Sequence, residues 1–260
     1  MNEYALVTGA SKGIGRAIAI ALAGKGYHLL LVSRSEQDLA ALAAEIENKY
    51  RAKAFYLSCD LSLPEAASKV AAWCGEQTSN LSVLVNNAGF GVWGNFDQLK
   101  LEEQRNMLRL NVDALVDLSY HLLPRLKQQK QAYILNVCST AAYQAMPTLA
   151  VYAASKSFVL SYSRALKHEL QDSTVSVSCL SPGPTDTGFA SRAGMDSPKL
   201  LELAKKFNML PEEVAVIAVK GMFRKKTEIV PGFLNQLSAF GARHLPKAWI
   251  ERISADLYKD

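Results

Sequence analysis

The sequence predicts an α/β fold, a single doubly wound domain in which helices cover both faces of a seven-stranded parallel sheet. Short apolar runs alternate with longer amphipathic segments along most of the chain, which is typical of strands joined by crossover helices. The runs Leu29–Val32 and Val83–Val85 are apolar at every position, as in strands buried on both faces. With 260 residues, 49% of them apolar and 20% charged, the chain suffices for one large core, so we expect one domain over residues 1–260.

The spacing of apolar residues predicts the individual elements. Seven short apolar runs are the predicted strands: Tyr4–Val7, Tyr27–Ser33, Ala54–Ser58, Ser82–Asn86, Tyr133–Cys138, Val175–Leu180 and Glu228–Val230. The segments between them carry apolar residues at helical spacing and are the predicted helices: Arg16–Ala23, Leu39–Lys49, Pro64–Gln77, Asp97–Lys127 and Ala150–Gln171. Residues 188–210 interrupt the alternation with Gly, Ser and Pro, and form either a mobile flap over a site or an ordinary connection.

Composition and charge argue against several classes of protein. The net charge is +5 and the charged residues are dispersed, so we expect no nucleic-acid binding. The cysteines form no C-x-x-C pair and no histidine stands at a spacing for zinc, so we expect no metal site and a reduced, cytoplasmic protein. The four cysteines are Cys59, Cys74, Cys138 and Cys179. The first predicted strand begins at Tyr4, which leaves no room for a secretory signal, and no window holds the roughly 18 consecutive apolar residues of a membrane helix.

A glycine-rich turn follows the first predicted strand. The segment Thr8–Gly15 reads T-G-A-S-K-G-I-G and leads into the predicted helix Arg16–Ala23. A strand, a glycine turn and a helix N-terminus together suit phosphate binding, because the first N–H groups of a helix lack partners and glycine lets a pyrophosphate approach the backbone. Glycines also form turns that bind nothing, and the G-x-x-x-G-x-G spacing differs from the common G-x-G-x-x-G fingerprint. The turn alone therefore leaves both interpretations open.

Further motifs follow this turn in a fixed order. They are N-N-A-G at Asn86–Gly89, an isolated asparagine at Asn111, a serine after the fifth strand at Ser139, Y-x-x-x-K at Tyr152 and Lys156, and P-G-x-x-x-T at Pro182–Thr187. Together with the glycine turn, this set resembles the short-chain dehydrogenase/reductase family in its compact NADP-preferring form, and the resemblance covers the chain from about Ala5 to Thr187. Ketoacyl, hydroxysteroid and aldehyde reductases are the similar members. The resemblance implies a Rossmann-like fold and an oxidoreductase.

The residues expected near the adenosine favour NADP(H) over NAD(H). The second strand ends in Ser33 and Arg34, with no carboxylate to bind a ribose 2′-hydroxyl, and a serine and an arginine suit a 2′-phosphate. Lys12 adds a second cation, although both cations are also consistent with ordinary solvated surface residues. Asp60 resembles the family residue that holds the adenine, or it caps the next helix. By resemblance the cofactor-binding residues are Gly9, Ser11, Lys12, Gly13, Ile14, Gly15, Ser33, Arg34, Asp60, Leu61, Asn87, Ala88, Gly89, Tyr152, Lys156, Pro182, Gly183, Thr185 and Thr187.

Four residues carry the predicted chemistry. Tyr152 and Lys156 are four positions apart, so both side chains project from one face of the predicted helix. A phenol has a pKa of about 10, and a neighbouring ammonium lowers this pKa because it favours the phenolate. Tyr152 is then the general acid in carbonyl reduction and the base in the reverse reaction. Ser139, at the carboxyl end of a strand, is placed to donate to the developing alkoxide. The resemblance implies that Lys156 also binds the nicotinamide ribose and that Asn111 belongs to a proton relay.

These observations predict an NADPH-dependent reductase of a ketone or aldehyde. The alternative is a catalytically weak NADP(H)-sensing binding protein of the same fold. The expected substrate-pocket wall includes Thr140–Thr148, Phe189, Met195, Leu200 and Leu203, and is apolar, which favours a lipophilic carbonyl or alcohol as the small-molecule partner. The resemblance also implies a homo-dimer or homo-tetramer, formed through the long helices Asp97–Lys127 and Ala150–Gln171.

Residues 232–260 form a predicted helical tail in which the resemblance is thinnest. Phe233, Leu237 and Phe240 stand at i, i+4 and i+7 and give the tail one apolar face, and a second helix is expected around Trp249–Leu257. We expect first that this face packs on the protein's own body or covers the substrate pocket. A subunit interface is the second alternative. Contact with a membrane surface, supported by nearby lysines and arginines, is less favoured.

Overall fold

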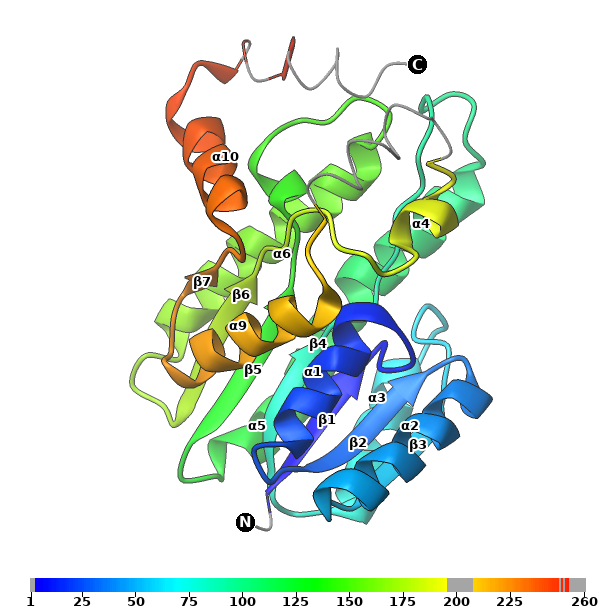
Figure 1. Ribbon diagram of the computed structural model, residues 1–260, viewed down its shortest axis with the longest axis vertical. Helices are drawn as coiled ribbons and strands as arrows, with labels where there is room; N and C mark the ends of the chain where they lie inside the picture. Colours follow the sequence, from blue (N-terminus) through cyan, green and yellow to red (C-terminus); the bar gives the residue numbers. More distant parts are fainter. Residues whose placement is uncertain (1–2, 196–207, 248, 250, 253–260) are drawn as a thin grey trace.

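The protein is built around one parallel sheet (Figure 1). The computed structural model describes residues 3–195, 208–247, 249 and 251–252. The strands are β1 (Tyr4–Thr8), β2 (His28–Ser33), β3 (Ala54–Ser58), β4 (Leu81–Asn86), β5 (Ala132–Val137), β6 (Val175–Leu180) and β7 (Glu228–Ile229). Their order across the sheet is β3-β2-β1-β4-β5-β6-β7, and every neighbouring pair is parallel. The predicted fold class is confirmed, and each predicted strand is found within one residue of its expected ends.

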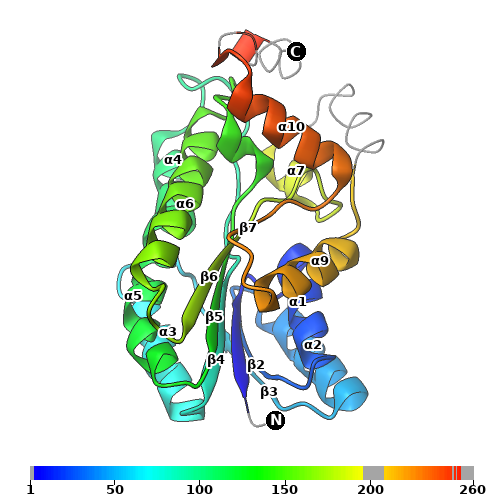
Figure 2. The same ribbon diagram turned by 90° about the vertical axis from the view of Figure 1, so that its left-hand side faces the viewer.

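Helices cover the two faces of the sheet as separate layers (Figure 2). One layer consists of α1 (Gly13–Ala23), α2 (Glu36–Tyr50) and α9 (Pro211–Phe223), and the other of α3 (Ala66–Gln77), α5 (Ala114–Lys127) and α6 (Ala150–Glu169). Successive strand residues point to opposite faces, so Leu29 and Leu31 join the core under the first layer while Leu30 and Val32 join the core under the second. This alternation explains why the central strands are apolar at every position.

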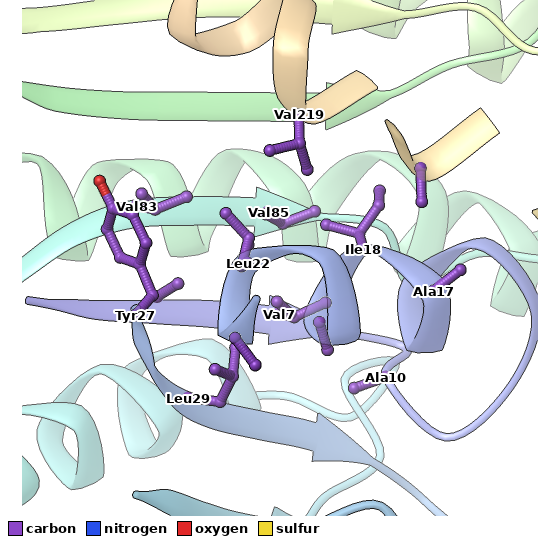
Figure 3. Packing of buried hydrophobic residues seen from close by; sticks show 14 of the residues in the cluster. Val7, Ala10, Ala17, Ile18, Leu22, Tyr27, Leu29, Val83, Val85 and Val219 are labelled. Atoms are coloured by element: carbon purple, nitrogen blue, oxygen red, sulfur yellow. The ribbon is translucent and has the colours of Figure 1, made fainter. Parts of the chain in front are cut away.

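The core beneath α1 anchors the glycine turn at the start of that helix. Ile18 and Leu22 of α1 pack with Val7 of β1, Val85 of β4 and Val219 of α9, and all are buried (Figure 3). Each such side chain stabilises the fold by about 1.5–3 kcal/mol when fully buried. The turn between β1 and α1 is therefore held between two well-packed elements.

The predicted helix Asp97–Lys127 is interrupted, and this part of the prediction is wrong. The structure has α4 (Leu101–Leu108), a π-helical turn η1 (Arg109–Asp113) and α5 in its place. A π-turn holds one extra residue, and such turns are frequent at functional sites. Here the wider turn contains the buried side chain of Asn111.

The C-terminal tail differs from its leading expectation. Helix α10 (Phe233–His244) forms as predicted, but the side chains of its apolar face are largely exposed: Phe233 by 76%, Leu237 by 58% and Phe240 by 58%. Packing of this face on the described part of the protein's own body is therefore not observed. The helix instead docks through Ala239, which is buried, and through Arg243, which forms an ion pair with Glu228. Most of the helix expected around Trp249–Leu257 lies outside the described residues.

In the segment 188–210, the structure describes a short helix, α7 (Phe189–Ala193), and the residues that flank it. Residues 196–207 lie outside the described part of the chain, so a flap there is not tested. Among the described residues, no helix combines the length and the apolar character needed to cross a membrane.

Candidate active site

The glycine turn and the N-N-A-G segment are bound to each other at the carboxyl edge of the sheet. The side-chain amide of Asn87 donates to the carbonyl oxygens of Thr8 at 2.9 Å and Gly9 at 3.2 Å. Gly9 has a φ of +62°, and a Cβ there would lie 2.7 Å from the Asn87 amide nitrogen. A Cβ at Gly15 would meet the same amide. These two glycines are thus required by the protein's own packing, in addition to any phosphate they admit.

Thr8 fixes the same two loops from inside, a role that the sequence analysis did not assign. Its hydroxyl oxygen accepts hydrogen bonds from the N–H groups of Asn87 and Ala88, both at 3.0 Å, and donates to the carbonyl of Val85. Thr8 is buried. The only sequence signal for this role is that Thr8 directly precedes Gly9, the first glycine of the turn.

Open space adjoins the glycine turn. A hollow of about 400 Å³ is lined by Ser11, Lys12, Gly13, Arg16, Asp38, Asp186, Thr187, Pro211 and Glu212. A Cβ on Gly13 would lie 2.8 Å from Cβ of Thr187, so the P-G-x-x-x-T segment reaches the turn. A second hollow of about 440 Å³ lies at the opposite edge of the sheet, around Tyr4 and His28, and contains none of the predicted site residues.

The predicted adenosine end has one feature that fits a ligand. The hydroxyl of Ser33, at the end of β2, is buried and has no hydrogen-bond partner in the described protein. A buried polar atom without a partner costs about 1–3 kcal/mol, and a cofactor oxygen would supply the missing partner. The residues present therefore fit a dinucleotide bound at this end of the sheet.

The cations at this end already contact carboxylates. Lys12 lies 3.4 Å from Asp38, and Arg34 lies 3.8 Å from Asp60. Burial alone would raise the pKa of Asp60, but hydrogen bonds from Ser62 together with nearby guanidinium groups hold this pKa below its ordinary value. The Ser62 N–H donates to Asp60, which closes a local turn after β3. Asp60 does not cap the next helix, because α3 begins at Ala66 and its N-cap residue is Glu65. Lys12 and Arg34 are largely exposed, so both ion pairs are weak and their cations are available to an anion.

Lys156 and Tyr152 lie together on α6, as their spacing predicted. The Lys156 ammonium is 5.8 Å from the centre of the Tyr152 ring, and both residues are buried. Lys156 donates to the backbone carbonyl of Val137 at 3.0 Å. Burial lowers the pKa of Lys156, and the neighbouring thiols of Cys138 and Cys179 oppose this shift. The ammonium and the Tyr152 ring thus lie side by side on α6.

Asn111 joins the π-turn to the loop after β4. Its side-chain oxygen accepts from the N–H of Phe90 at 3.0 Å, and its side-chain nitrogen donates to the Phe90 carbonyl at 3.0 Å and to the hydroxyl of Ser155 at 3.1 Å. A Cβ on Gly89 would lie 2.8 Å from the Asn111 side-chain oxygen and 3.5 Å from the Lys156 nitrogen. Gly89 therefore keeps the space between Asn111 and Lys156 clear of side-chain atoms. The sequence analysis missed Phe90 and Ser155 because their contribution is made through these hydrogen bonds.

Ser139 follows β5 and begins the short helix η2 (Thr140–Tyr143). Its hydroxyl accepts from the N–H of Ala141 at 3.1 Å. Ala141 belongs to the same apolar cluster as Tyr152, so the serine loop lies against the tyrosine helix. Asn111, Ser139, Tyr152 and Lys156, which are far apart in the sequence, thus come from neighbouring elements at one end of the molecule.

The surroundings of Tyr152 are apolar. The Tyr152 and Phe189 rings are 5.4 Å apart, and the cluster of buried and partly buried residues around them consists of Phe90, Val92, Trp93, Met107, Ala141, Met146, Leu149, Val151, Ala153 and Met195. Four residues expected in the pocket wall, Ala141, Met146, Phe189 and Met195, belong to this cluster. Leu200 and Leu203, also expected there, lie outside the described residues.

Comparisons with known proteins agree with this geometry. The chain is 35% identical over 178 residues to a very-long-chain 3-oxoacyl-CoA reductase of Laccaria bicolor, a match that covers 68% of this chain and 53% of that protein. It is 30% identical over 230 residues to a ketoacyl reductase of Nostoc sp., which covers 88% of this chain and 78% of that protein. The chain thus spans about half the length of the fungal relative it matches.

A solved structure and a family model also match this chain. A short-chain dehydrogenase from Sphingobium yanoikuyae, solved in complex with NADPH, superposes with a TM-score of 0.81 and 30% identity over 93% of each chain. A family model described as short chain dehydrogenase matches residues 3–197. The chain therefore belongs to the short-chain dehydrogenase/reductase family.

Proposed function

We propose that the protein is an NADP(H)-dependent reductase that converts a lipophilic ketone or aldehyde to an alcohol. The observation that carries this proposal is the pairing of Tyr152 and Lys156 on α6, with Asn111 and Ser139 on adjoining elements and a glycine turn at the same edge of the sheet. The apolar surroundings of Tyr152 support a lipophilic substrate. The names of the two relatives favour a 3-oxoacyl group as its carbonyl.

The proposed mechanism assigns one task to each side chain. The chemistry that the cofactor supplies when bound is donation of a hydride to the carbonyl carbon. Tyr152 then gives its phenolic proton to the carbonyl oxygen, and the Ser139 hydroxyl donates a hydrogen bond to the same oxygen as negative charge develops there. The positive charge of Lys156 favours the phenolate form of Tyr152, and its ammonium donates hydrogen bonds to the nicotinamide ribose. Asn111 holds the loop at Phe90 and lies beside Lys156, where a proton relay would pass.

The preference for NADP(H) rests on the end of β2. No carboxylate stands at Ser33 or Arg34 to repel a 2′-phosphate, and the Ser33 hydroxyl has no partner within the described protein. Arg34 and Lys12 are exposed cations at the same end, each near a single carboxylate. A 2′-phosphate accepts charge-assisted hydrogen bonds from such groups, which are about twice as strong as neutral ones.

We also propose a cytoplasmic homo-oligomer formed through α5 and α6. Tyr120 on α5 is 76% exposed, and Phe158 on α6 is 43% exposed and stacks on Tyr162. Large aromatic side chains are enriched in protein interfaces. These helices thus offer an apolar surface separate from that of α10.

NADPH oxidation over a panel of carbonyl compounds tests the function. The panel includes 3-oxoacyl-CoA thioesters of increasing chain length, steroid ketones and simple aldehydes, with Tyr152→Phe as the matched blank. Turnover of a lipophilic member that disappears in Tyr152→Phe supports the proposal. Tight NADPH binding without turnover of any member would instead favour the NADP(H)-sensing binding protein.

A further inference from the structure

We infer that Arg192 on α7 is an additional cofactor-binding residue, whose guanidinium closes over the bound dinucleotide and pairs with one of its phosphates. The inference rests on the proposed use of a nicotinamide dinucleotide. It adds a cation from α7 to the cofactor-binding residues predicted in the glycine turn and at the end of β2.

Helix α7 is fixed over the loop that follows β4. The Trp93 N–H donates to the carbonyl of Ala193 at 2.9 Å, and a Cβ on Gly91 would lie 2.7 Å from the end of the Phe189 ring. At its other side, Thr187 touches Gly13 of the glycine turn. The segment from Thr187 to Ala193 therefore spans the carboxyl edge of the sheet, where ligands of doubly wound folds bind.

The guanidinium of Arg192 lies on a ring that the site itself holds in place. Its carbon atom is 5.0 Å from the centre of the Phe90 ring. The N–H and carbonyl groups of Phe90 are both bound by the side chain of Asn111. Arginine stacked on an aromatic ring keeps its N–H groups free in the plane of the guanidinium, where they can bind a phosphate.

Charge around Arg192 is unbalanced. The charges of Arg34 and Arg192 both act on the carboxylate of Asp60, and among the described residues Asp60 is the acidic group whose charge acts on Arg192. Partial burial lowers the pKa of Arg192, and the charge of Arg34 lowers it further. Within the described part of the chain, no carboxylate lies within 4.0 Å of the Arg192 guanidinium. Two guanidinium groups that share one carboxylate leave a net positive charge, which an additional anion would neutralise.

The position of this charge identifies the anion. Arg34 follows β2 and Asp60 follows β3, so the pair lies at the predicted adenosine end of the sheet. The Phe90 ring beneath Arg192 belongs to the apolar cluster around Tyr152, but the charged groups that act on Arg192 are Arg34 and Asp60, at the adenosine end. The anion is therefore a phosphate of the dinucleotide, either the 2′-phosphate or the pyrophosphate.

Calorimetric titration of four ligands tests the inference. Wild type, Arg192→Gln and Arg192→Lys are each titrated with NADPH, NADH, adenosine 2′-monophosphate and ADP, and thermal unfolding of the free proteins is recorded. Lys220→Gln, on the exposed side of α9, removes the same charge and serves as the control. We expect Arg192→Gln to weaken NADPH binding about tenfold, as loss of one charge-assisted contact predicts, and Arg192→Lys to recover part of it.

The four ligands distinguish which phosphate Arg192 contacts. Weaker binding of NADPH and of adenosine 2′-monophosphate, with ADP unchanged, places Arg192 on the 2′-phosphate. Weaker binding of NADPH, NADH and ADP, with adenosine 2′-monophosphate unchanged, places it on the pyrophosphate. An Arg192→Gln variant that binds NADPH as tightly as the control overturns the inference and leaves the proposed function intact. Wild type that binds neither NADPH nor NADH overturns the proposed function itself.

Discussion

The ammonium of Lys156 donates a hydrogen bond to the backbone carbonyl of Val137 at 3.0 Å. Val137 is the last residue of β5 and precedes Ser139 by two positions, whereas Lys156 lies one helical turn after Tyr152. This single bond therefore connects the loop that carries the serine with the helix that carries the tyrosine. A group buried this deeply contributes to the stability of the protein as well as to its chemistry.

Replacing Lys156 with methionine should change the pH dependence of stability. Burial lowers the pKa of Lys156 below the value of 10.5 that it has in the unfolded chain. Between those two pKa values the unfolded chain binds more protons, so the lysine becomes less destabilising as pH rises. Urea unfolding of both proteins at several pH values from 7 to 10 measures this. We expect the free energy of unfolding of wild type to rise relative to that of the variant as pH increases. A difference that stays constant would contradict the lowered pKa.

Tyr152→Phe should abolish turnover and leave NADPH binding nearly unchanged, because only the phenolic proton is removed. The ring that packs on Phe189 is retained in this variant. Lys156→Ala should reduce both turnover and binding, since the ammonium acts on the phenol and on the ribose. Steady-state kinetics on a substrate of the carbonyl panel and NADPH titration distinguish these outcomes. More than a few per cent of residual activity in Tyr152→Phe would show that another group supplies the proton.

Much of this arrangement follows from local patterns in the sequence. The strands are apolar because two helical layers cover the sheet, and the spacing of Tyr152 and Lys156 places them on one face of α6. The π-turn at Asn111 could not be predicted from periodicity, because its contacts are with Phe90 and Ser155, which are distant in sequence. The spacing of apolar residues likewise predicted the apolar face of α10, but it could not predict whether another part of the protein covers that face.

The cofactor preference should reside at the end of β2. We expect NADPH to bind at least about tenfold more tightly than NADH, which corresponds to about 1.4 kcal/mol. Arg34→Asp should shift the preference toward NADH by about 1–3 kcal/mol, since a charge-assisted contact is exchanged for repulsion. Fluorescence titration of both cofactors measures this, and Arg34→Gln separates loss of the contact from added repulsion. Equal affinity of the unmodified protein for the two cofactors would contradict the assignment of Arg34.

Asn111→Ala should destabilise the free protein in addition to slowing catalysis. The substitution leaves the N–H and the carbonyl of Phe90 without their partners, and an unsatisfied buried polar group costs about 1–3 kcal/mol. Urea unfolding without cofactor measures this effect separately from turnover. Asn106→Ala, which removes an asparagine one turn earlier on α4 whose partner is the exposed Arg109, is the matched control. Equal stability of the two variants would show that the bonds to Phe90 contribute little.

The exposed face of α10 predicts that its apolar residues do not stabilise an isolated subunit. The side chains of Phe233 and Leu237 are 76% and 58% exposed, so the double variant Phe233→Ser, Leu237→Ser should change the free energy of unfolding by no more than about 0.5 kcal/mol per site. Ala239→Asp, on the buried side of the same helix, should be clearly destabilising because it buries an unpaired charge. Urea unfolding at low protein concentration compares the three proteins. If the double variant is as unstable as Ala239→Asp, the apolar face is covered in the subunit. Light scattering and liposome sedimentation of wild type and the double variant then decide between the two remaining roles: a smaller particle would identify a subunit interface, and loss of liposome binding would identify a membrane-contacting face.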